Sequence, residues 1–306
     1  MKSLLCNLKL VYPPFSNQEG EWLWDDKEVR EYVKDSKLYM IVHRKELKFC
    51  DYDGKEIAKT GIFKFKLKLG STKTPFIYFD IFKHYLNSSY IIDFELGDKF
   101  LRITDVENSN ILYWATPDKI IYDFLNKFIN LNFEKTYDLR KFQKYELYYV
   151  GISKEGDSFS RLFEKAHHGR LRILSNENSK NRYARLTDEL MILLFKIEWF
   201  NVNIIDNINE LNYYIDDEKI IVSDAEKAFI NLLDTKYNEV KYTQYPCGND
   251  GLYDEGLSTY CYSIDEDIVL YTKDKLQFVG ARGMEAKRDI IFVEKDKAVI
   301  IKLSQS

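Results

Sequence analysis

The stretch Leu147-Tyr148-Tyr149-Val150-Gly151-Ile152-Ser153 decides how the second half of this chain is interpreted. Its aromatic and β-branched residues predict a strand over residues 145–152, because such side chains suit an extended, half-buried backbone. A loop containing glycine follows, and then a predicted helix over residues 158–168. That helix carries Arg161, twelve residues after Tyr149, and ends in His167-His168. The segment therefore predicts a strand that leads through a short loop into a basic helix.

Two further elements follow later in the chain. Residues 190–197 are almost all apolar and predict a buried strand. Residues 224–235 predict a second helix, which carries Glu226, and Asn238 comes three residues after that helix. This part of the chain is therefore a mixture of strands and helices.

The order and spacing of these elements resembles the GIY-YIG nuclease family. In that family a strand ending in Tyr-Ile/Val-Gly precedes a helix that carries an arginine, and a later helix supplies a metal-binding glutamate. The resemblance covers roughly a third of the chain, residues 132–245. It implies a divalent-metal-dependent endonuclease that cleaves nucleic acid, with DNA favoured over RNA. The catalytic residues that it implies are Tyr149, Arg161, His168, Glu226 and Asn238, with Glu226 as the ligand of Mg²⁺ (or Mn²⁺).

The chemistry of phosphodiester hydrolysis points to the same residues. It needs a deprotonated water and a cation that offsets the charge growing on the phosphate. Mg²⁺ keeps most of its waters and binds through one or two carboxylates, so Glu226 alone is a sufficient candidate ligand. The planar guanidinium of Arg161 suits a phosphate, and Tyr149 could relay a proton if its pKa fell from about 10. Lys165 and His168 fall on the same helical face as Arg161 and are expected to line the same cleft.

One family tyrosine has no clear counterpart. The first strand of the family normally carries Gly-Ile-Tyr some ten residues before the second tyrosine, and no such tripeptide occurs here. Tyr137 precedes Tyr149 by twelve residues, and Tyr145 is expected on the same strand face as Tyr149, with Tyr148 on the opposite face. Both Tyr137 and Tyr145 remain candidates.

Plainer roles compete with the catalytic ones. Ser223-Asp224-Ala225-Glu226 has the spacing of a capping box, in which Glu226 would only cap its helix. Arg161 and the histidines could be solvated helix residues, and Asn238 a turn residue. The alternative function is a non-catalytic protein that binds nucleic acid or a partner through a degenerate GIY-YIG site.

The sequence pattern divides the chain into three predicted units, giving an α+β fold. Residues 1–131 predict a β-rich recognition or regulatory domain, in which Phe63, Phe65 and Leu67 alternate with lysines and a helix begins at Thr116-Pro117. Residues 132–245 predict the GIY-YIG-like α/β nuclease core. Residues 246–306 predict a β-rich extension packed on the core, with a hairpin near its end.

Charge is distributed unevenly along the chain. The formal net charge is −4, which argues against a protein that coats nucleic acid with its whole surface. Residues 138–185, however, contain eleven Lys and Arg against six Asp and Glu, a local net charge of +5. Such a basic segment is what a phosphate-binding cleft requires.

Composition also limits the cellular setting and the partners. No apolar run approaches the roughly 18 residues of a membrane span, and the start of the chain is too polar for a signal peptide. The four cysteines are scattered without C-x-x-C spacing, which favours reduced thiols. We therefore expect a cytoplasmic protein that binds nucleic acid and no membrane, and that could also bind a protein partner or a second copy of itself.

Overall fold

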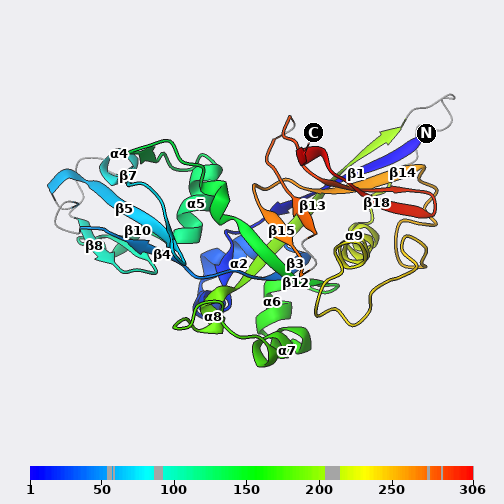
Figure 1. Cartoon of the computed structure of the whole chain (residues 1–306), viewed down its shortest axis with the longest axis horizontal. Coiled ribbons are helices and arrows are strands. Elements are labelled where there is room, and N and C mark those ends of the chain that lie inside the picture. Colours follow the sequence, from blue (N-terminus) through cyan, green and yellow to red (C-terminus); the bar gives the residue numbers. More distant parts are fainter. Residues whose placement is uncertain are drawn as a thin grey trace.

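The chain folds into two lobes that lie side by side (Figure 1). The larger lobe holds both ends of the chain. Both lobes combine helices with mostly antiparallel strands, so the predicted α+β class is confirmed. The computed structural model describes residues 1–53, 57, 59–85, 92–203, 214–273, 276–283 and 285–305.

The larger lobe is built on a single sheet, which has ten strands in the described part of the chain. Its strands pair in the order β16-β15-β12-β3-β13-β1-β14-β17-β18, and β2 pairs with β13 beside this path. The strand bounds are β1 Lys2–Leu10, β2 Phe15–Ser16, β3 Leu38–His43, β12 Lys144–Ile152, β13 Leu190–Asn203, β14 Thr259–Ile264, β15 Val269–Tyr271, β16 Gln277–Val279, β17 Ile290–Glu294 and β18 Lys297–Ile301.

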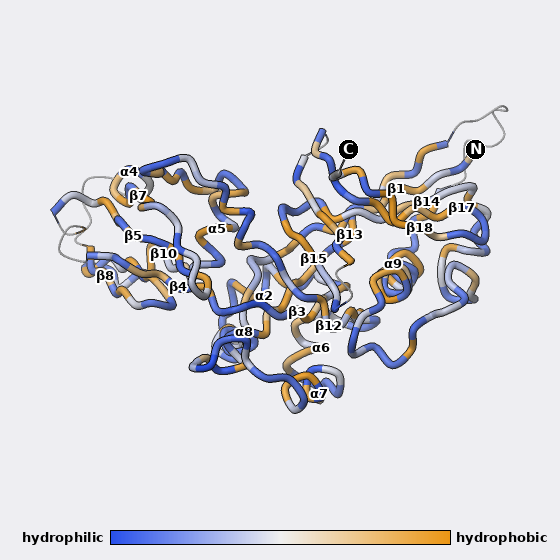
Figure 2. The backbone as a smooth tube through the Cα atoms, in the orientation of Figure 1, coloured by the Kyte–Doolittle hydropathy of each residue, from blue (hydrophilic) through white to orange (hydrophobic). Residues whose placement is uncertain are grey.

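The central strands of this sheet are apolar because helices cover both of their faces. All six residues of β3 are buried, and Met40 and Val42 face a core shared with α9 (Glu218–Leu233). Tyr39 and Ile41 face a second core on the opposite side. Figure 2 shows the hydrophobic residues gathered along these strands and α9. Helical segments around the second core are α1 Asn17–Trp22, η1 Leu23–Asp25, α2 Lys27–Val33, α6 Ser158–Phe163, α7 His168–Asn176 and α8 Leu186–Glu189.

The smaller lobe lies between β3 and β12 in the sequence and has its own core. Phe63, Phe65 and Leu67 are buried there while Lys64 and Lys66 are only partly buried, which confirms the predicted alternation. Its elements are β4 Leu47–Cys50, β5 Ile62–Leu69, β6 Thr72–Lys73, β7 Ile77–Asp80, α4 Ile81–Tyr85, β8 Ile92–Leu96, β9 Leu101–Asp105, β10 Asn110–Ala115, α5 Pro117–Leu125, β11 Asn132–Phe133 and η2 Leu139–Phe142.

Helix α5 begins as its sequence predicts. The Thr116 side chain accepts a hydrogen bond from the Lys119 N–H, and Pro117 occupies the first helical position, where no N–H is needed. The buried residues Ile120 and Ile121 pack into the core of the smaller lobe. Local capping chemistry is thus sufficient to place this helix.

The lobes do not follow the predicted division at residue 131. Strands β1 and β3 fall within residues 1–131, yet they pair with β12 and β13 at the centre of the larger sheet. Strands β14 to β18, from residues 246–306, extend the same sheet through β1 and β12. The larger lobe is therefore assembled from segments before and after the smaller lobe, a long-range pairing that periodicity within one segment does not reveal.

Two predicted helices have different limits in the structure. The helix predicted over residues 158–168 is divided into α6, which ends at Phe163, and α7, which begins at His168. The helix predicted from Asp224 begins earlier, at Glu218, because the Asp217 side chain caps its N-terminus by accepting from the N–H groups of Lys219 and Ile220. Both differences change the surroundings of candidate site residues.

The hairpin predicted near the end of the chain is confirmed as β17 and β18, which pair in antiparallel register. Among the described helices the longest, α9, has 16 residues. None of the described helices is long and apolar enough to cross a membrane.

Candidate active site

A β-bulge in β12 sets the direction of Tyr149. Between Leu147 and Tyr149 the pairing with β3 shifts by one residue, so Tyr148 and Tyr149 both project to the side of α6 and α7. Tyr145 and Leu147 project to the opposite side, into the core with α9. The expectation that Tyr145 shares a face with Tyr149, and that Tyr148 lies opposite, is therefore wrong, because it assumed unbroken alternation along the strand.

The tyrosine that packs against Tyr149 is Tyr39 of β3. Tyr39 pairs with Gly151 across the two strands, and its ring stacks on Tyr149 with centroids 6.1 Å apart and planes at 20°. A Cβ on Gly151 would lie 2.5 Å from the Tyr39 hydroxyl oxygen and 2.7 Å from the Tyr149 ring. Glycine at position 151 is thus required by the close approach of the two rings.

Neither tyrosine considered from the sequence occupies this position. Tyr145 is fully buried, and its hydroxyl donates to Gln143 Oε1 at 2.6 Å. Tyr137 packs in the smaller lobe, where it stacks on Phe142. Sequence reasoning missed Tyr39 because the smaller lobe separates it from Tyr149 by more than a hundred residues; the only signal was the apolar run around it.

Tyr149 opens onto a pocket of about 260 Å³, which we call the Tyr149 pocket. Elements β12, α6, α7 and α9 and the segment after α9 contribute to its walls. All five residues implied by the sequence line it, together with eight others. The thirteen are Tyr149, Arg161, His167, His168, Gly169, Arg172, Glu226, Ile230, Tyr237, Asn238, Glu239, Val240 and Tyr242.

Arg161 and His168 reach this pocket from two different helices. Arg161 lies on α6, and His168 is the first residue of α7. Lys165 lies in the connection between them, is exposed and does not line the pocket, so the prediction that it shares a helical face with Arg161 is wrong. The Arg161 guanidinium makes no hydrogen bond or ion pair with any described residue. It is available to an anion.

His167 holds a more central position than His168. It is buried, its Nδ1 accepts from the Arg170 N–H at 2.8 Å, and its Nε2 lies 2.6 Å from the Tyr39 hydroxyl oxygen. Burial lowers the pKa of His167 to about 4, with Arg161 and Arg170 acting in the same direction, so the ring is neutral near neutral pH. Since Nδ1 accepts, Nε2 carries the proton and donates it to the Tyr39 oxygen. The Tyr39 O–H must then point elsewhere.

The groups around the Tyr149 hydroxyl act on its pKa in opposite directions. Burial raises the pKa of Tyr149 first, and the charge of Glu226 raises it further, whereas the Tyr39 hydroxyl and the Arg161 guanidinium act to lower it. Burial also raises the pKa of Tyr39. Tyr149 lines the pocket and Tyr39 is fully buried behind it, so Tyr149 is the one that a bound molecule can touch.

Glu226 projects from the middle of α9 and not from its first turn. Because the helix begins at Glu218 and is capped by Asp217, the capping-box role suggested by Ser223 is excluded. The Glu226 carboxylate makes no hydrogen bond or ion pair with any described residue. Burial raises its pKa to about 7, opposed by the positive charges of Lys154 and Lys227. It is a partly buried acid without a local partner.

Asn238 acts on the backbone of β12. Its Nδ2 donates to the Val150 carbonyl at 2.7 Å, and its Oδ1 accepts from the Val150 N–H at 3.0 Å and from the Thr235 hydroxyl at 2.8 Å. These bonds fix the residue between Tyr149 and Gly151. Asn238 is therefore a positioning residue, whose amide is already committed within the protein.

We expect Asn238→Ala to lower the free energy of unfolding by about 2–4 kcal/mol, because it leaves the buried N–H and C=O of Val150 without partners. Urea denaturation measures this loss. Asn176→Ala, at an exposed position, is the matched control and should stay within about 0.5 kcal/mol of the parent. Equal stability of the two variants would show that the clamp on Val150 is dispensable.

Most basic residues of the segment 138–185 lie outside the Tyr149 pocket. Arg140, Lys180 and Arg185 are paired with Asp138, Glu146 and Asp188, and none of these residues lines the Tyr149 pocket. Of the eleven basic residues only Arg161 and Arg172 line it, and Arg172 is paired with Glu239. The positive charge offered to a ligand there is therefore concentrated in Arg161.

The donors that line the Tyr149 pocket suit a weakly held magnesium ion. Within the described ranges, no three His, Cys, Asp or Glu side chains gather into a cluster that could enclose a metal. Glu226 is the one lining carboxylate without an ion-pair partner in the described part of the chain, since Glu239 is paired with Arg172. A single carboxylate with waters and a substrate oxygen matches the coordination habit of Mg²⁺.

Comparisons of this chain with models of protein families, with curated proteins and with solved structures found no match.

Proposed function

We propose that this chain is a divalent-metal-dependent endonuclease of the GIY-YIG type, which hydrolyses nucleic acid and prefers DNA to RNA. The observation that carries the proposal is that Tyr149, Arg161 and Glu226 line one pocket although they come from a strand and two separate helices. Two of them, Arg161 and Glu226, are charged side chains without a partner among the described residues. A partly buried charge without a partner is costly to the fold, which supports a role toward a ligand.

Tyr39 is our candidate for the first tyrosine of the family pattern, in place of Tyr137 and Tyr145. It lies on the strand adjacent to β12 and stacks on Tyr149. The smaller lobe would then be an insertion between the two tyrosine strands. This assignment accounts for the missing tripeptide near Tyr149, since the equivalent strand lies more than a hundred residues earlier.

In the proposed reaction Arg161 binds the scissile phosphate through its fork of N–H groups and stabilises the charge that develops there. The Tyr149 phenolate accepts a proton from the attacking water as the water oxygen bonds to phosphorus. The bond from phosphorus to the leaving ester oxygen breaks, and that oxygen takes a proton from solvent water. His167 donates to the Tyr39 oxygen, which leaves the Tyr39 O–H free to donate toward Tyr149 and stabilise its phenolate. Glu226 would hold Mg²⁺, which when bound supplies positive charge beside the phosphate and makes water more acidic.

The decisive experiment is cleavage of supercoiled plasmid DNA by the full chain with Mg²⁺ or Mn²⁺, compared with the same reaction in EDTA. We expect nicked and linear products only with the metal. A single-stranded RNA of matched sequence tests the preference for DNA. If the chain bound the plasmid but cleaved it under none of these conditions, the proposal would be overturned in favour of a non-catalytic binding protein.

Tyr39→Phe should reduce the cleavage rate about tenfold to a hundredfold, because the phenolate of Tyr149 loses a hydrogen-bond donor. The pKa of Tyr149 should rise with that loss, so the ascending limb of the pH–rate profile should move to higher pH. The rate is measured by plasmid cleavage at a series of pH values that covers this ascending limb.

Tyr145→Phe is the matched control for this prediction. It removes a hydroxyl from the other face of the same sheet, where the bond to Gln143 has no connection with the pocket. It should leave the pH–rate profile in place. A profile that shifts in neither variant, or equally in both, would remove Tyr39 from the proposed arrangement.

A further inference from the structure

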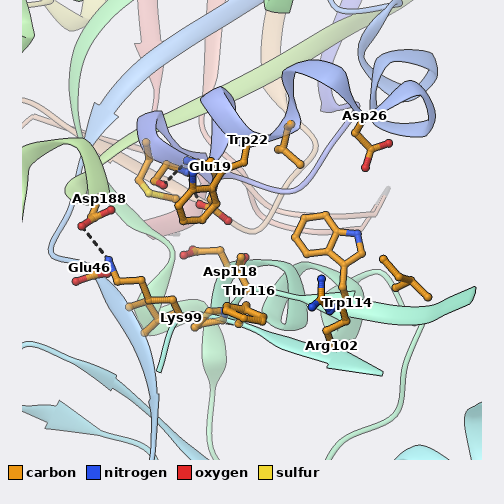
Figure 3. Close-up of a pocket in the computed structure, with 17 residues that line it drawn as sticks. Glu19, Trp22, Asp26, Glu46, Lys99, Arg102, Trp114, Thr116, Asp118 and Asp188 are labelled. Atoms are coloured by element: carbon orange, nitrogen blue, oxygen red, sulfur yellow. Dashed lines mark hydrogen bonds and ion pairs between the residues drawn. The ribbon is translucent and has the colours of Figure 1, made fainter. Parts of the chain in front are cut away.

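A second cavity, of about 320 Å³, lies between the two lobes, and we call it the interlobe cavity. Segments α1, η1 and the start of α2 form its wall on the larger lobe. Strands β9 and β10 and the start of α5 form the wall on the smaller lobe (Figure 3). Its volume is at the lower end of the roughly 300–1,000 Å³ found for sites that enclose small molecules.

Two tryptophans contribute aromatic surface to this cavity from opposite lobes. Trp22 comes from α1 and Trp114 from β10, and Figure 3 shows both rings directed into the space between the ribbons. The Trp22 side chain is 60% exposed, an unusual state for the largest apolar side chain. Indole faces attract flat rings and cations.

The charges that line the interlobe cavity are mostly negative. Five carboxylates face two basic side chains, Lys99 and Arg102. Lys99 already bridges Glu46 and Asp188, and Arg102 is paired with Glu95. The charge of the lining residues therefore disfavours a phosphate or any other anion.

Two of these carboxylates have no cationic partner in the described part of the chain. Asp118 is held by both oxygens to Arg44 at 2.8 Å. Glu19 accepts from the Ser16 N–H and from the hydroxyls of Ser16 and Thr116, and Asp26 accepts from backbone N–H groups, so neither forms an ion pair with a described residue. Burial raises the pKa of Glu19 to about 7, and the nearby charge of Asp118 raises it further. A cation placed beside Glu19 would oppose this rise in pKa, because it stabilises the ionised carboxylate.

We propose that the interlobe cavity binds a small planar organic cation, with Trp22 and Trp114 contacting its ring and Glu19 its charge. The aromatic faces that line the cavity suit the flat ring of such a molecule, and the carboxylate without a cationic partner suits its positive charge. Because the walls come from both lobes, the bound molecule also holds the lobes to each other. The proposal does not depend on nuclease activity.

Three probes that share the same ring but differ in charge test this proposal. They are the cation 1-methylnicotinamide, the neutral nicotinamide and the anion nicotinate. Binding to the full chain is measured by titration calorimetry at about pH 8, where Glu19 is ionised. We expect the cation to bind at least about tenfold more tightly than the neutral probe, and the anion not to bind. Absence of binding by the cation, or equal affinities for cation and anion, would overturn the proposal.

Variants of the lining residues assign the binding to this cavity. Glu19→Gln should weaken the cation about tenfold and leave the neutral probe unchanged, and it keeps the helix cap because glutamine also serves in a capping box. Trp22→Ala should weaken both probes. Glu28→Gln, on the exposed side of α2 and outside the cavity, is the control and should change neither. Cation binding that survives Glu19→Gln and Trp22→Ala unchanged would place it elsewhere and refute the proposal.

Discussion

Glu226→Gln is expected to reduce metal-dependent DNA cleavage by at least about a thousandfold while the protein remains folded. Glutamine has the same shape but lacks the charge that would hold Mg²⁺, and loss of the metal removes several kcal/mol of transition-state stabilisation. The fold should survive, because the Glu226 carboxylate makes no bond to any described residue. Plasmid cleavage at saturating Mg²⁺ measures the loss.

The matched control is Glu218→Gln, the first residue of the same helix, which does not line the pocket. It should cleave at the rate of the parent. If Glu226→Gln cleaved DNA as fast as Glu218→Gln and melted at the same temperature, Glu226 would not be the metal ligand.

Glu226 should also make the stability of the metal-free protein depend on pH. Its pKa rises from 4.5 to about 7 on folding, so the folded state binds more protons than the unfolded state between these values. Stability contributed by the protonated acid is complete below pH 4.5 and is lost as the pH rises through 7. In EDTA the parent should therefore lose about 3 kcal/mol of stability across this pH range and Glu226→Gln should not, as measured by urea denaturation.

The sequence was informative wherever structure is determined by neighbouring residues. The alternation of Phe63, Phe65 and Leu67 with lysines, the cap at Thr116 and the hairpin of β17 and β18 are all local, and all three predictions are confirmed. Arg161 and Glu226, which the resemblance implies, both line the Tyr149 pocket, and their catalytic roles stay predictions.

Prediction failed where the structure depends on distant segments. Strand β3 pairs with β12 across an entire lobe, so Tyr39 could not be connected to Tyr149 by spacing along the chain. The bulge in β12 cannot be read from its side chains, and it reverses the face on which Tyr145 lies relative to Tyr149.

Asp224 explains why the predicted start of α9 lies too late in the sequence. An acid after a serine resembles the first turn of a helix, whereas Asp224 is buried in its middle. Its carboxylate accepts from the hydroxyls of Tyr245 and Tyr262 at 2.7 and 2.8 Å and from the Leu252 N–H at 2.8 Å. Asp224 therefore serves these long-range hydrogen bonds, although its sequence context is also typical of a helix cap.

Arg161→Lys is expected to lower the turnover number by about 10²–10³-fold while DNA binding weakens less than about threefold. Lysine keeps the positive charge but cannot present two parallel N–H groups to the phosphate oxygens. The effect should therefore fall on the transition state, in which the phosphate charge rearranges, more than on the bound substrate. Single-turnover cleavage and fluorescence anisotropy measure the two quantities separately.

The absence of an ion-pair partner for Arg161 among the described residues makes this experiment clear to interpret, because the substitution leaves no carboxylate stranded. Arg172→Lys supplies the comparison within the same pocket, since that guanidinium is already paired with Glu239. Its turnover should stay within about threefold of the parent. Losses of equal size in turnover and in binding for Arg161→Lys would make Arg161 a general contact to DNA, and no loss in either would place it outside the reaction.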